Sequence, residues 1–179
     1  MKSIIFLTVM SLIMNGETEI FNFDSPTTSG EWMTADDVVM EGVSSSKFII
    51  NPDGTATFSG IVSPDNNGGF ASARAALKNV FNDFEGVVIR VNGDGNIYSL
   101  RFRTDINFDG ISYQAKFKSE SGEWREYKIP LSDFKPTFRG NTLSNKPKLE
   151  SKNIKQIGIL IADKQFGNFE LNIDWVKLY

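Results

Sequence analysis

The chain has 179 residues, of which 40% are hydrophobic and 23% are charged, and its formal net charge is −3 at pH 7. This length suits one domain with a full core, and the slightly negative charge gives no general attraction to nucleic acid. The sequence contains neither cysteine nor histidine, which excludes disulfides, thiolate metal sites, cysteine nucleophiles and the usual serine triad. Any catalysis would therefore depend on carboxylates, lysine or tyrosine.

The N-terminal segment has the layout of a secretory leader. One cation, Lys2, precedes a short apolar run from Ser3 to Met14. The run is too short to cross a bilayer, so we expect no transmembrane segment. We predict a signal peptide at residues 1–16 and one β-sandwich domain at residues 17–179, with export to the periplasm or the extracellular space. The alternative is a first strand buried in the fold of a cytoplasmic protein.

The first half of the chain is typical of short strands joined by turns. Ile20 to Asp24 alternates apolar and polar residues and predicts a strand. A long loop follows, which carries Trp32 and is expected to be anchored by Val39 and Met40. Further strands are predicted over residues 47–50, 55–62 and 70–77, and a single helical turn over residues 79–85.

The segment from Asn66 to Arg74 combines a sharp bend with a strand. Two asparagines and two glycines in a row tolerate positive φ, and the small residues that follow alternate up to a single cation, Arg74. A bend at the mouth of a strand is a place for a ligand or a partner. Asn67 and Arg74 are therefore candidate binding residues, and an ordinary turn is the alternative.

The second half shows the clearest alternation. A β-hairpin is predicted from the strand 87–91, the turn 92–96 and the strand 97–104. In the second of these strands Tyr98, Leu100 and Phe102 share one face, which we expect to be dry. More strands are predicted over 113–118, 123–129, 154–163 and 169–176. About ten strands and one short helical turn, without a long amphipathic helix, predict an all-β sandwich of jelly-roll type.

Cationic side chains share the opposite parity of the predicted hairpin and the strand after it. Arginine offers a planar fork of donors that suits carboxylates, phosphates or sugar hydroxyls. We predict a ligand- or partner-binding face, and its members are Arg90, Arg101, Arg103, Lys116 and Lys118, with Arg74 joining from a neighbouring strand. An ordinary solvated face, paired across strands with Glu126, is the alternative interpretation.

The carboxylates offer weaker candidates. Asp24 closes the first strand and Asp174 lies in the last, and such termini are often neighbours in sandwiches, so this pair is a candidate site for a structural calcium ion. A glycosidase role for the same pair would require a defined separation across a cleft. Asp94, between Gly93 and Gly95, is typical of a turn and lacks the third glycine of a dinucleotide site. No cofactor other than the calcium ion is predicted.

Several short motifs, taken together and in order, resemble the complex I intermediate-associated protein 30 family. They are Asp37 to Ser44, Asn66 to Arg74, Gly93 to Gly95 with Tyr98 and Arg101, Tyr113 to Ala115, Trp124, Ile129 to Phe134, Pro136 to Gly140, Gln156 to Gly158 and Ile173 to Trp175. The resemblance implies a galactose-binding-domain-like β-sandwich and the role of an assembly factor for respiratory NADH:ubiquinone oxidoreductase. It implies no catalytic residues.

Two functional hypotheses follow. The first is a non-enzymatic binding domain that recognises a protein partner or client, such as a respiratory complex subunit, during assembly. The alternative is a carbohydrate-binding module that uses the arginine-rich face of a concave sheet, with Tyr98, Tyr113 or Trp124 as stacking platforms. A hydrolase based on carboxylates is a third and weaker reading.

Overall fold

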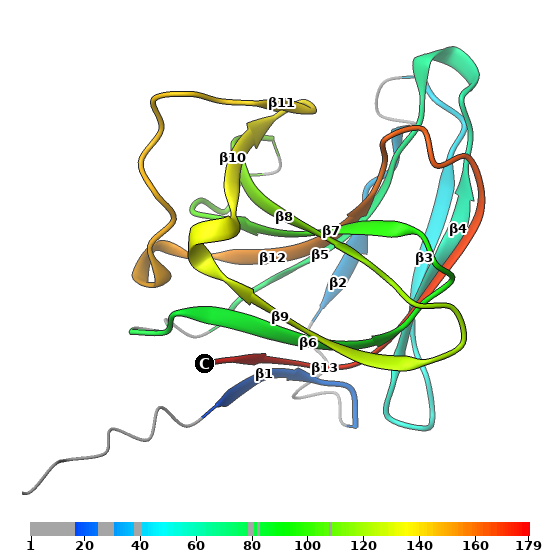
Figure 1. The fold of residues 1–179 in the computed structure, drawn as a ribbon. Helices are drawn as coiled ribbons and strands as arrows, with labels where there is room; N and C mark the ends of the chain where they lie inside the picture. Colours follow the sequence, from blue (N-terminus) through cyan, green and yellow to red (C-terminus); the bar gives the residue numbers. More distant parts are fainter. Residues whose placement is uncertain (1–16, 25–30, 38–40, 79–80, 82, 108) are drawn as a thin grey trace, which may run out of the picture.

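The computed structural model describes residues 17–24, 31–37, 41–78, 81, 83–107 and 109–179. Within these residues the chain is almost entirely β-structure, as the alternating pattern predicted (Figure 1). The strands are β1 (Thr18–Asn22), β2 (Trp32–Thr34), β3 (Ser45–Ile50), β4 (Ala56–Val62), β5 (Ala71–Ala76), β6 (Gly86–Asn92), β7 (Ile97–Arg103), β8 (Ser112–Lys118), β9 (Trp124–Pro130), β10 (Lys135–Phe138), β11 (Asn141–Thr142), β12 (Gln156–Ile161) and β13 (Gly167–Leu178). Three short 3-10 helices are η2 (Asp65–Asn67), η3 (Leu131–Asp133) and η4 (Ser151–Asn153).

The strands form two antiparallel sheets that pack face to face. Sheet A has the order β3-β4-β13-β6-β9, with β1 also paired to β13, and sheet B has the order β11-β10-β8-β7-β12-β5-β2. In Figure 1 the strands of sheet B lie above β6, β13 and β1 of sheet A, and the edge strands β10 and β11 rise from sheet B at one end. The predicted jelly-roll sandwich is confirmed, with thirteen strands among the described residues instead of about ten.

The predicted hairpin between residues 87 and 104 is wrong. Strand β6 belongs to sheet A and pairs with β9 and β13, whereas β7 belongs to sheet B and pairs with β8 and β12. The turn from Gly93 to Asn96 carries the chain from one sheet to the other. Both strands have an apolar face, and placing them in different sheets lets the two faces pack against each other across the core.

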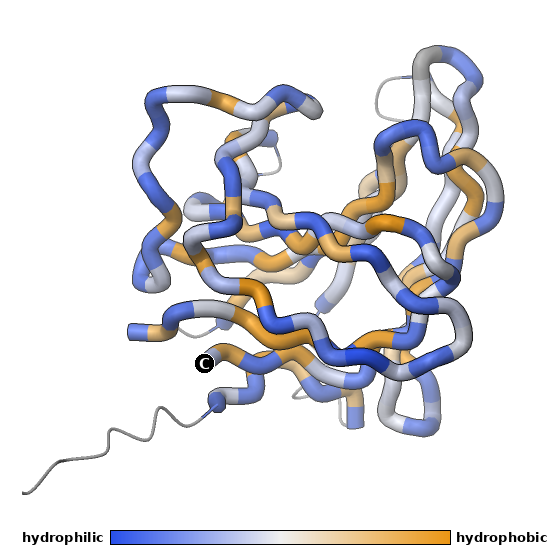
Figure 2. Tube along the Cα trace, in the orientation of Figure 1, coloured by the Kyte–Doolittle hydropathy of each residue, from blue (hydrophilic) through white to orange (hydrophobic). Residues whose placement is uncertain are grey.

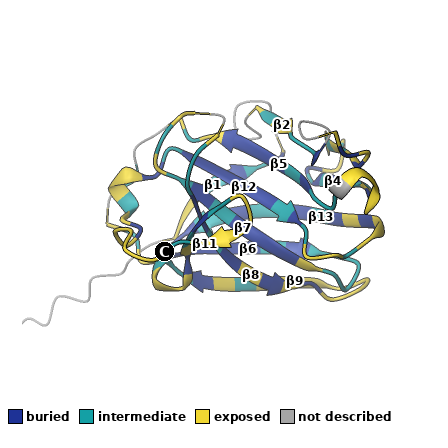
Figure 3. Ribbon diagram, turned by 90° about the horizontal axis from the view of Figure 1, so that it is seen from above, coloured by how far each residue is buried: buried dark blue, intermediate teal, exposed yellow. Residues whose placement is uncertain are grey.

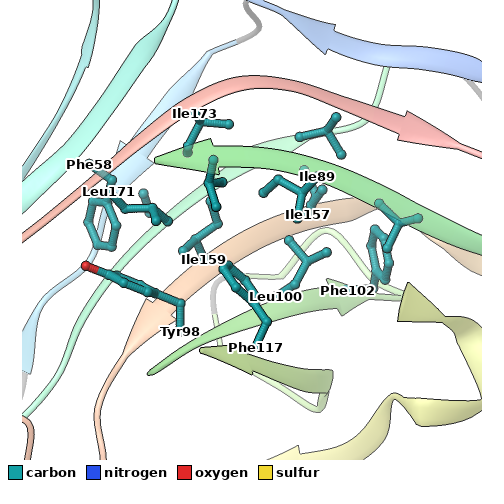
Figure 4. Close-up of a cluster of buried hydrophobic side chains, with 14 of the residues drawn as sticks. Phe58, Ile89, Tyr98, Leu100, Phe102, Phe117, Ile157, Ile159, Leu171 and Ile173 are labelled. Carbon is teal, nitrogen blue, oxygen red and sulfur yellow. The ribbon is translucent and has the colours of Figure 1, made fainter. Parts of the chain in front are cut away.

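The core lies between the sheets and consists of the side chains on the inward face of each strand. In Figure 4, Tyr98, Leu100 and Phe102 of β7 lie with the side chains of β12 and meet residues of sheet A. Tyr98 and Phe102 are completely buried and Tyr113 is 5% exposed, so the predicted dry face is confirmed. Burying one large apolar side chain contributes about 1.5–3 kcal/mol, so this alternation accounts for much of the sandwich's stability. The two tyrosines are therefore not available as platforms for a sugar.

Burial and hydropathy follow the same alternation outside the core centre. Apolar and polar residues alternate along the tube in Figure 2, and Figure 3 shows mostly buried residues along β12 and an exposed edge strand β11. Trp32 lies in the edge strand β2, not in a loop as predicted, and its ring stacks on Phe48 at 4.4 Å between centroids. The two stacked rings pack against the core beside β3, which is an edge strand of sheet A.

Some predictions fall on residues outside the described ranges. These are the leader at residues 1–16, the loop anchors Val39 and Met40, and part of the helical turn at residues 79–85. Within that turn, Phe81 and Phe84 are described, and both pack against the core as expected. No helix in the described ranges is long and apolar enough to span a membrane.

Candidate functional site

Three arginines gather on the outer face of sheet B. The register places Gly158 of β12 opposite Arg74 of β5 on one side and opposite Arg101 of β7 on the other. One step along the same face, Arg103 is opposite Gln156. These three arginines are called the arginine cluster below. Arg74 lies on the same face as Arg101 and Arg103, as predicted, but its strand β5 is not the direct neighbour of β7, because β12 lies between them.

Local contacts hold two of the guanidinium groups in place. Nε and Nη2 of Arg101 both donate to Oγ of Ser112, at 3.1 and 2.5 Å. Nη1 of Arg103 donates to the carbonyl oxygen of Gly110 at 2.9 Å. Because each contact uses only part of an arginine's five donors, further N–H groups remain to bind a ligand.

Gly158 lets the neighbouring strand approach closely between Arg74 and Arg101. A Cβ atom at this position would lie 2.9 Å from the carbonyl oxygen of Ala73 and 3.3 Å from Cβ of Arg74. Strands are spaced about 4.8 Å apart, so the backbones of these two arginines, with β12 between them, lie about 10 Å apart. A side chain at position 158 would therefore crowd Arg74.

Burial disfavours the charged form of each arginine in the cluster. Burial, and then the nearby charges of Arg103 and Arg74, lower the pKa of Arg101 to about 10. Burial and the charge of Arg103 also lower the pKa of Arg74, which is only 9% exposed. Burial lowers the pKa of Arg103, although Asp105 and Asp109 act in the opposite direction. The guanidinium groups stay charged at neutral pH, and their burial carries a cost in solvation.

The rest of this outer face mixes polar and apolar side chains. Its neighbours in the register include Ser72, Ser99 and Gln114, together with the exposed Met33 and Ile97. Every aromatic residue in the described strands of sheet B has the inward parity: Trp32, Tyr98, Phe102, Tyr113, Phe117 and Phe138. The described strands of sheet B therefore place no aromatic ring on this face.

Arg90 and Trp124 form a separate group on the other side of the molecule. Both belong to sheet A, where the Arg90 guanidinium lies 5.2 Å from the centre of the Trp124 ring and forms an ion pair with Asp174. The register places Glu126 opposite Arg90, which fits the alternative of a paired, solvated face at this position. The expectation that Arg90 shares one face with Arg101 and Arg103 is wrong, because it rested on the hairpin that does not form.

The two aspartates of the predicted calcium pair have separate contacts. Asp174 is engaged by Arg90, and Asp24 lies in the turn after β1, close to Gly54. Among the described residues, no group of three or more acidic side chains is placed to hold a metal ion. Calcium binding by Asp24 and Asp174 stays a prediction.

The bend at residues 66–69 contacts the buried carboxylate of Asp37, which was not among the predicted site residues. Asp37 is fully buried and accepts hydrogen bonds from N and Oγ of Ser44 at 2.9 and 2.5 Å. It also accepts from the backbone N–H of Gly69 at 2.6 Å and of Phe70 at 3.3 Å. Burial alone raises the pKa of Asp37, but these hydrogen bonds outweigh burial and lower it below its ordinary value.

This carboxylate explains the residues of the bend. Asn66 has φ of 53°, in the left-handed region that asparagine tolerates, and its Nδ2 donates to the carbonyl oxygen of Glu41. A Cβ atom at Gly68 would lie 2.5 Å from Oδ2 of Asp37. The bend is therefore a structural link between two loops. Asn67 lies in η2, and its predicted role in binding stays a prediction.

Two hollows lie away from the arginine cluster. The larger, of about 630 Å³, is open and lies over β3, β4 and β13 of sheet A, where Lys47, Ser59 and Glu170 are among its lining residues. The other, of about 510 Å³, lies between β8 and β9 and includes Lys116 and Glu126. Neither lining includes a member of the arginine cluster.

The two antiparallel sheets define a β-sandwich domain, and its fold is similar to that of solved carbohydrate-binding modules. A family 11 carbohydrate-binding module from Clostridium thermocellum, solved with a β-1,3-1,4-mixed-linked tetrasaccharide, is similar over 91% of this chain and 95% of its own, with TM-score 0.64 and 19% identity. The agarase AgWH50C is similar over 91% of this chain and 24% of its own, with TM-score 0.60 and 10% identity. At these identities the likeness shows the fold alone.

The family is shown by the sequence. The model of "Complex I intermediate-associated protein 30 (CIA30)" matches residues 21–173, so the chain belongs to this family. A relative named probable complex I intermediate-associated protein 30, mitochondrial, from Caenorhabditis elegans is 26% identical over 89% of this chain and 53% of its own length. The Drosophila melanogaster protein of the family is 25% identical over 91% of this chain and 63% of its own. The chain thus spans about half to two thirds of the length of these relatives.

Proposed function

We propose that this chain is a non-catalytic binding domain that recognises a protein partner during assembly of a respiratory complex, through the outer face of sheet B. Membership of the CIA30 family supports the assembly role, since the relatives are named complex I intermediate-associated protein 30. The observation that carries the binding face is the arginine cluster, which places three charged side chains on one face of sheet B around Gly158.

Two features of the chain favour binding over catalysis. The sequence lacks the histidine and cysteine on which most acid–base and nucleophilic sites depend. The arginine cluster lies on paired strands in the middle of a seven-stranded sheet, which holds its side chains at fixed positions. A rigid set of donors without an adjacent base suits recognition.

The proposals for a respiratory partner and for the compartment are based on the names of the relatives. The chain covers 53% of the C. elegans relative, so that protein's other half is outside the comparison. The relatives are named as mitochondrial, which gives no support to export, and the predicted leader lies outside the described residues. We propose that the domain acts where the membrane-bound respiratory complex is assembled.

Affinity capture tests this proposal. The purified chain is immobilised, incubated with detergent extracts of respiratory membranes from its native host, and the captured proteins are identified by mass spectrometry. Subunits of the NADH:ubiquinone oxidoreductase should be enriched over an unrelated β-sandwich used as bait. If no respiratory subunit is enriched, the assembly role is wrong.

A carbohydrate ligand is the second candidate function. The similarity to a family 11 carbohydrate-binding module solved with a tetrasaccharide favours it. The absence of an aromatic platform on the outer face of the described strands of sheet B argues against the stacking that sugar rings usually require. A glycan array probed with the purified chain decides: reproducible binding of neutral oligosaccharides supports this candidate, and a blank array removes it.

A further inference from the structure

Two free strand edges face each other across the hollow between β8 and β9. Strand β9 is the end strand of sheet A, and among the described residues it pairs only with β6. Strand β10 pairs with β8 only as far as Gln114, so no described strand covers that side of residues 115–118. Figure 1 shows the chain crossing from β8 of sheet B to β9 of sheet A and returning through η3 to β10. The sandwich is therefore open between these two edges.

The hollow runs along the edges of the two strands. Its volume is about 510 Å³, and its lining consists of residues 115–118 of β8, residues 126–129 of β9 and Asp133. Neighbouring residues of a strand point to opposite faces, so a hollow that touches four consecutive residues of each strand follows the edges and not a face. A ligand in this hollow therefore meets backbone N–H and C=O groups.

The hydrogen-bond pattern shows which backbone groups point into the hollow. The N–H of Ser119 donates to the carbonyl oxygen of Asn96 at 2.9 Å. The N–H of Leu131 donates to the carbonyl oxygen of Glu85 at 2.8 Å. Every second residue of an antiparallel pair exchanges hydrogen bonds with its partner, so the odd-numbered residues of β8 and β9 bond to β7 and β6. The backbone groups that point to the free edges, and that make no hydrogen bond to another described residue, belong to Lys116, Lys118, Glu126 and Lys128.

The hollow has an apolar floor and a charged rim. Ala115, Phe117 and Ile129 are buried at its base, and the ring of Phe117 packs on that of Tyr127 at 4.8 Å between centroids. The exposed rim carries both charges, and four of its residues take part in none of the seven ion pairs among the described residues: Lys118, Lys128, Glu126 and Asp133. The hollow therefore suits a chain with apolar side chains on one face and charged side chains on the other.

We propose that an extended segment of a partner protein adds as a β-strand to the free edge of β9, in the hollow between β8 and β9. Only an extended backbone offers donors and acceptors that alternate at the spacing of a strand edge, and strand addition is a recurring mode of peptide recognition. The segment has apolar residues at alternate positions, toward the floor, and charged residues between them, toward the rim. This inference rests on the proposed function only for the class of the ligand, a protein, and adds a site away from the outer face of sheet B.

Titration with a designed peptide tests the inference. The probe is acetylated and amidated Val-Lys-Val-Glu-Val-Thr-Val, and the control is the same peptide with every backbone nitrogen methylated, which removes its backbone donors. With the full chain saturated by the probe, amide hydrogen exchange followed by NMR should slow about tenfold or more at Glu126 and Lys128. The control should bind at least about tenfold more weakly. No binding of the probe, equal binding of both peptides, or protection of other amides alone would overturn the inference.

Two variants at one position locate the site. Lys128→Pro removes an N–H that points to the free edge and leaves the pairing with β6 intact, whereas Lys128→Ala removes only the side chain. We expect Lys128→Pro to weaken binding of the probe about tenfold or more, and Lys128→Ala less than about threefold. Equal affinities of the two variants, both melting cooperatively, would contradict strand addition at β9. If Lys128→Pro does not fold, the two peptides on the wild-type chain decide.

The outcomes separate this inference from the proposed function and from other occupants. Protection of Glu126 and Lys128 before any peptide is added would show that a second copy or another part of the chain fills the hollow, and would overturn the partner segment. Respiratory subunits captured equally by wild type and by Lys128→Pro would sink only the edge site. Binding of the probe without capture of any respiratory subunit would refute the assembly role and leave the edge site standing.

Discussion

Replacing Asp37 by asparagine is the sharpest test of the structural link between the loops at residues 37–44 and 63–70. The Asp37 carboxylate is completely buried and accepts four hydrogen bonds, from Ser44, Gly69 and Phe70. Ser44 in turn uses its Oγ to accept from the backbone N–H of Ser63 at 2.9 Å. Asparagine has nearly the same shape, so Asp37→Asn removes the charge and one acceptor without opening a cavity.

The expected loss follows from the donors that remain. Oδ1 of Asp37 accepts from one donor and Oδ2 from three, at distances of 2.5 to 3.3 Å. Whichever way the amide turns, its NH₂ group faces at least one buried N–H donor. A hydrogen bond to a charged group contributes about 1.5–3 kcal/mol, and an unsatisfied buried donor costs about as much. We expect Asp37→Asn to lower the free energy of unfolding by about 3 kcal/mol and the melting temperature by roughly 6–12 °C.

The effect has a defined pH dependence. The pKa of Asp37 is lower in the folded chain than its unfolded value of about 3.9. Its carboxylate therefore stabilises the fold fully above that value, and the contribution is lost as the pH falls through the folded-state pKa. Urea unfolding curves of wild type and variant, measured from neutral pH downward, should converge below about pH 4.

A neighbouring acid provides the control. Asp65 lies in the same bend but is exposed, and among the described residues its carboxylate bonds only to the nearby Ser63. Asp65→Asn should change the free energy of unfolding by less than about 0.5 kcal/mol. If Asp37→Asn lowers the free energy of unfolding by less than about 1 kcal/mol, or by the same amount at neutral and at acid pH, the carboxylate does not hold the two loops together.

Two further substitutions test packing. Gly68→Ala places a Cβ atom 2.5 Å from Oδ2 of Asp37 and 2.9 Å from the carbonyl oxygen of Asp65, so we expect a loss of about 1–3 kcal/mol in urea unfolding; unchanged stability would contradict the close contact. Tyr98→Phe removes the hydrogen bond from the buried tyrosine hydroxyl to Oδ2 of Asp94, which measures 3.0 Å, and should cost about 1 kcal/mol in the same assay. A more stable Tyr98→Phe variant would show that the hydroxyl does not contribute to stability.

The core parity of each strand could be predicted from the sequence. Tyr98, Leu100 and Phe102 alternate with Ser99 and polar neighbours, and the structure buries the first three between the sheets. The same alternation placed Arg101 and Arg103 on the outer face. A strand has a period of two residues, so the alternation of apolar and polar residues distinguishes its two faces once the strand is recognised.

The residues that belong to one site could not be predicted in the same way. Arg90 has the right parity but lies in sheet A, while Arg74, far from Arg101 in sequence, is separated from it only by β12. Alternation predicts on which face of its strand a side chain lies. It does not predict with which other strands that strand pairs. Pairing between distant segments is set by packing of the whole chain.

The bend at residues 66–69 shows both sides of this division. The sequence by itself determined that residues 66–69 turn, because asparagine and glycine tolerate the backbone angles of a turn. Only the tertiary structure decided what they turn around, since the buried Asp37 carboxylate comes from a loop about thirty residues earlier and needs two backbone donors from the bend. Neighbouring residues determine the local preference of the backbone for a turn. The burial of a charged side chain, and the hydrogen bonds that stabilise it there, depend on segments that meet only in the folded chain.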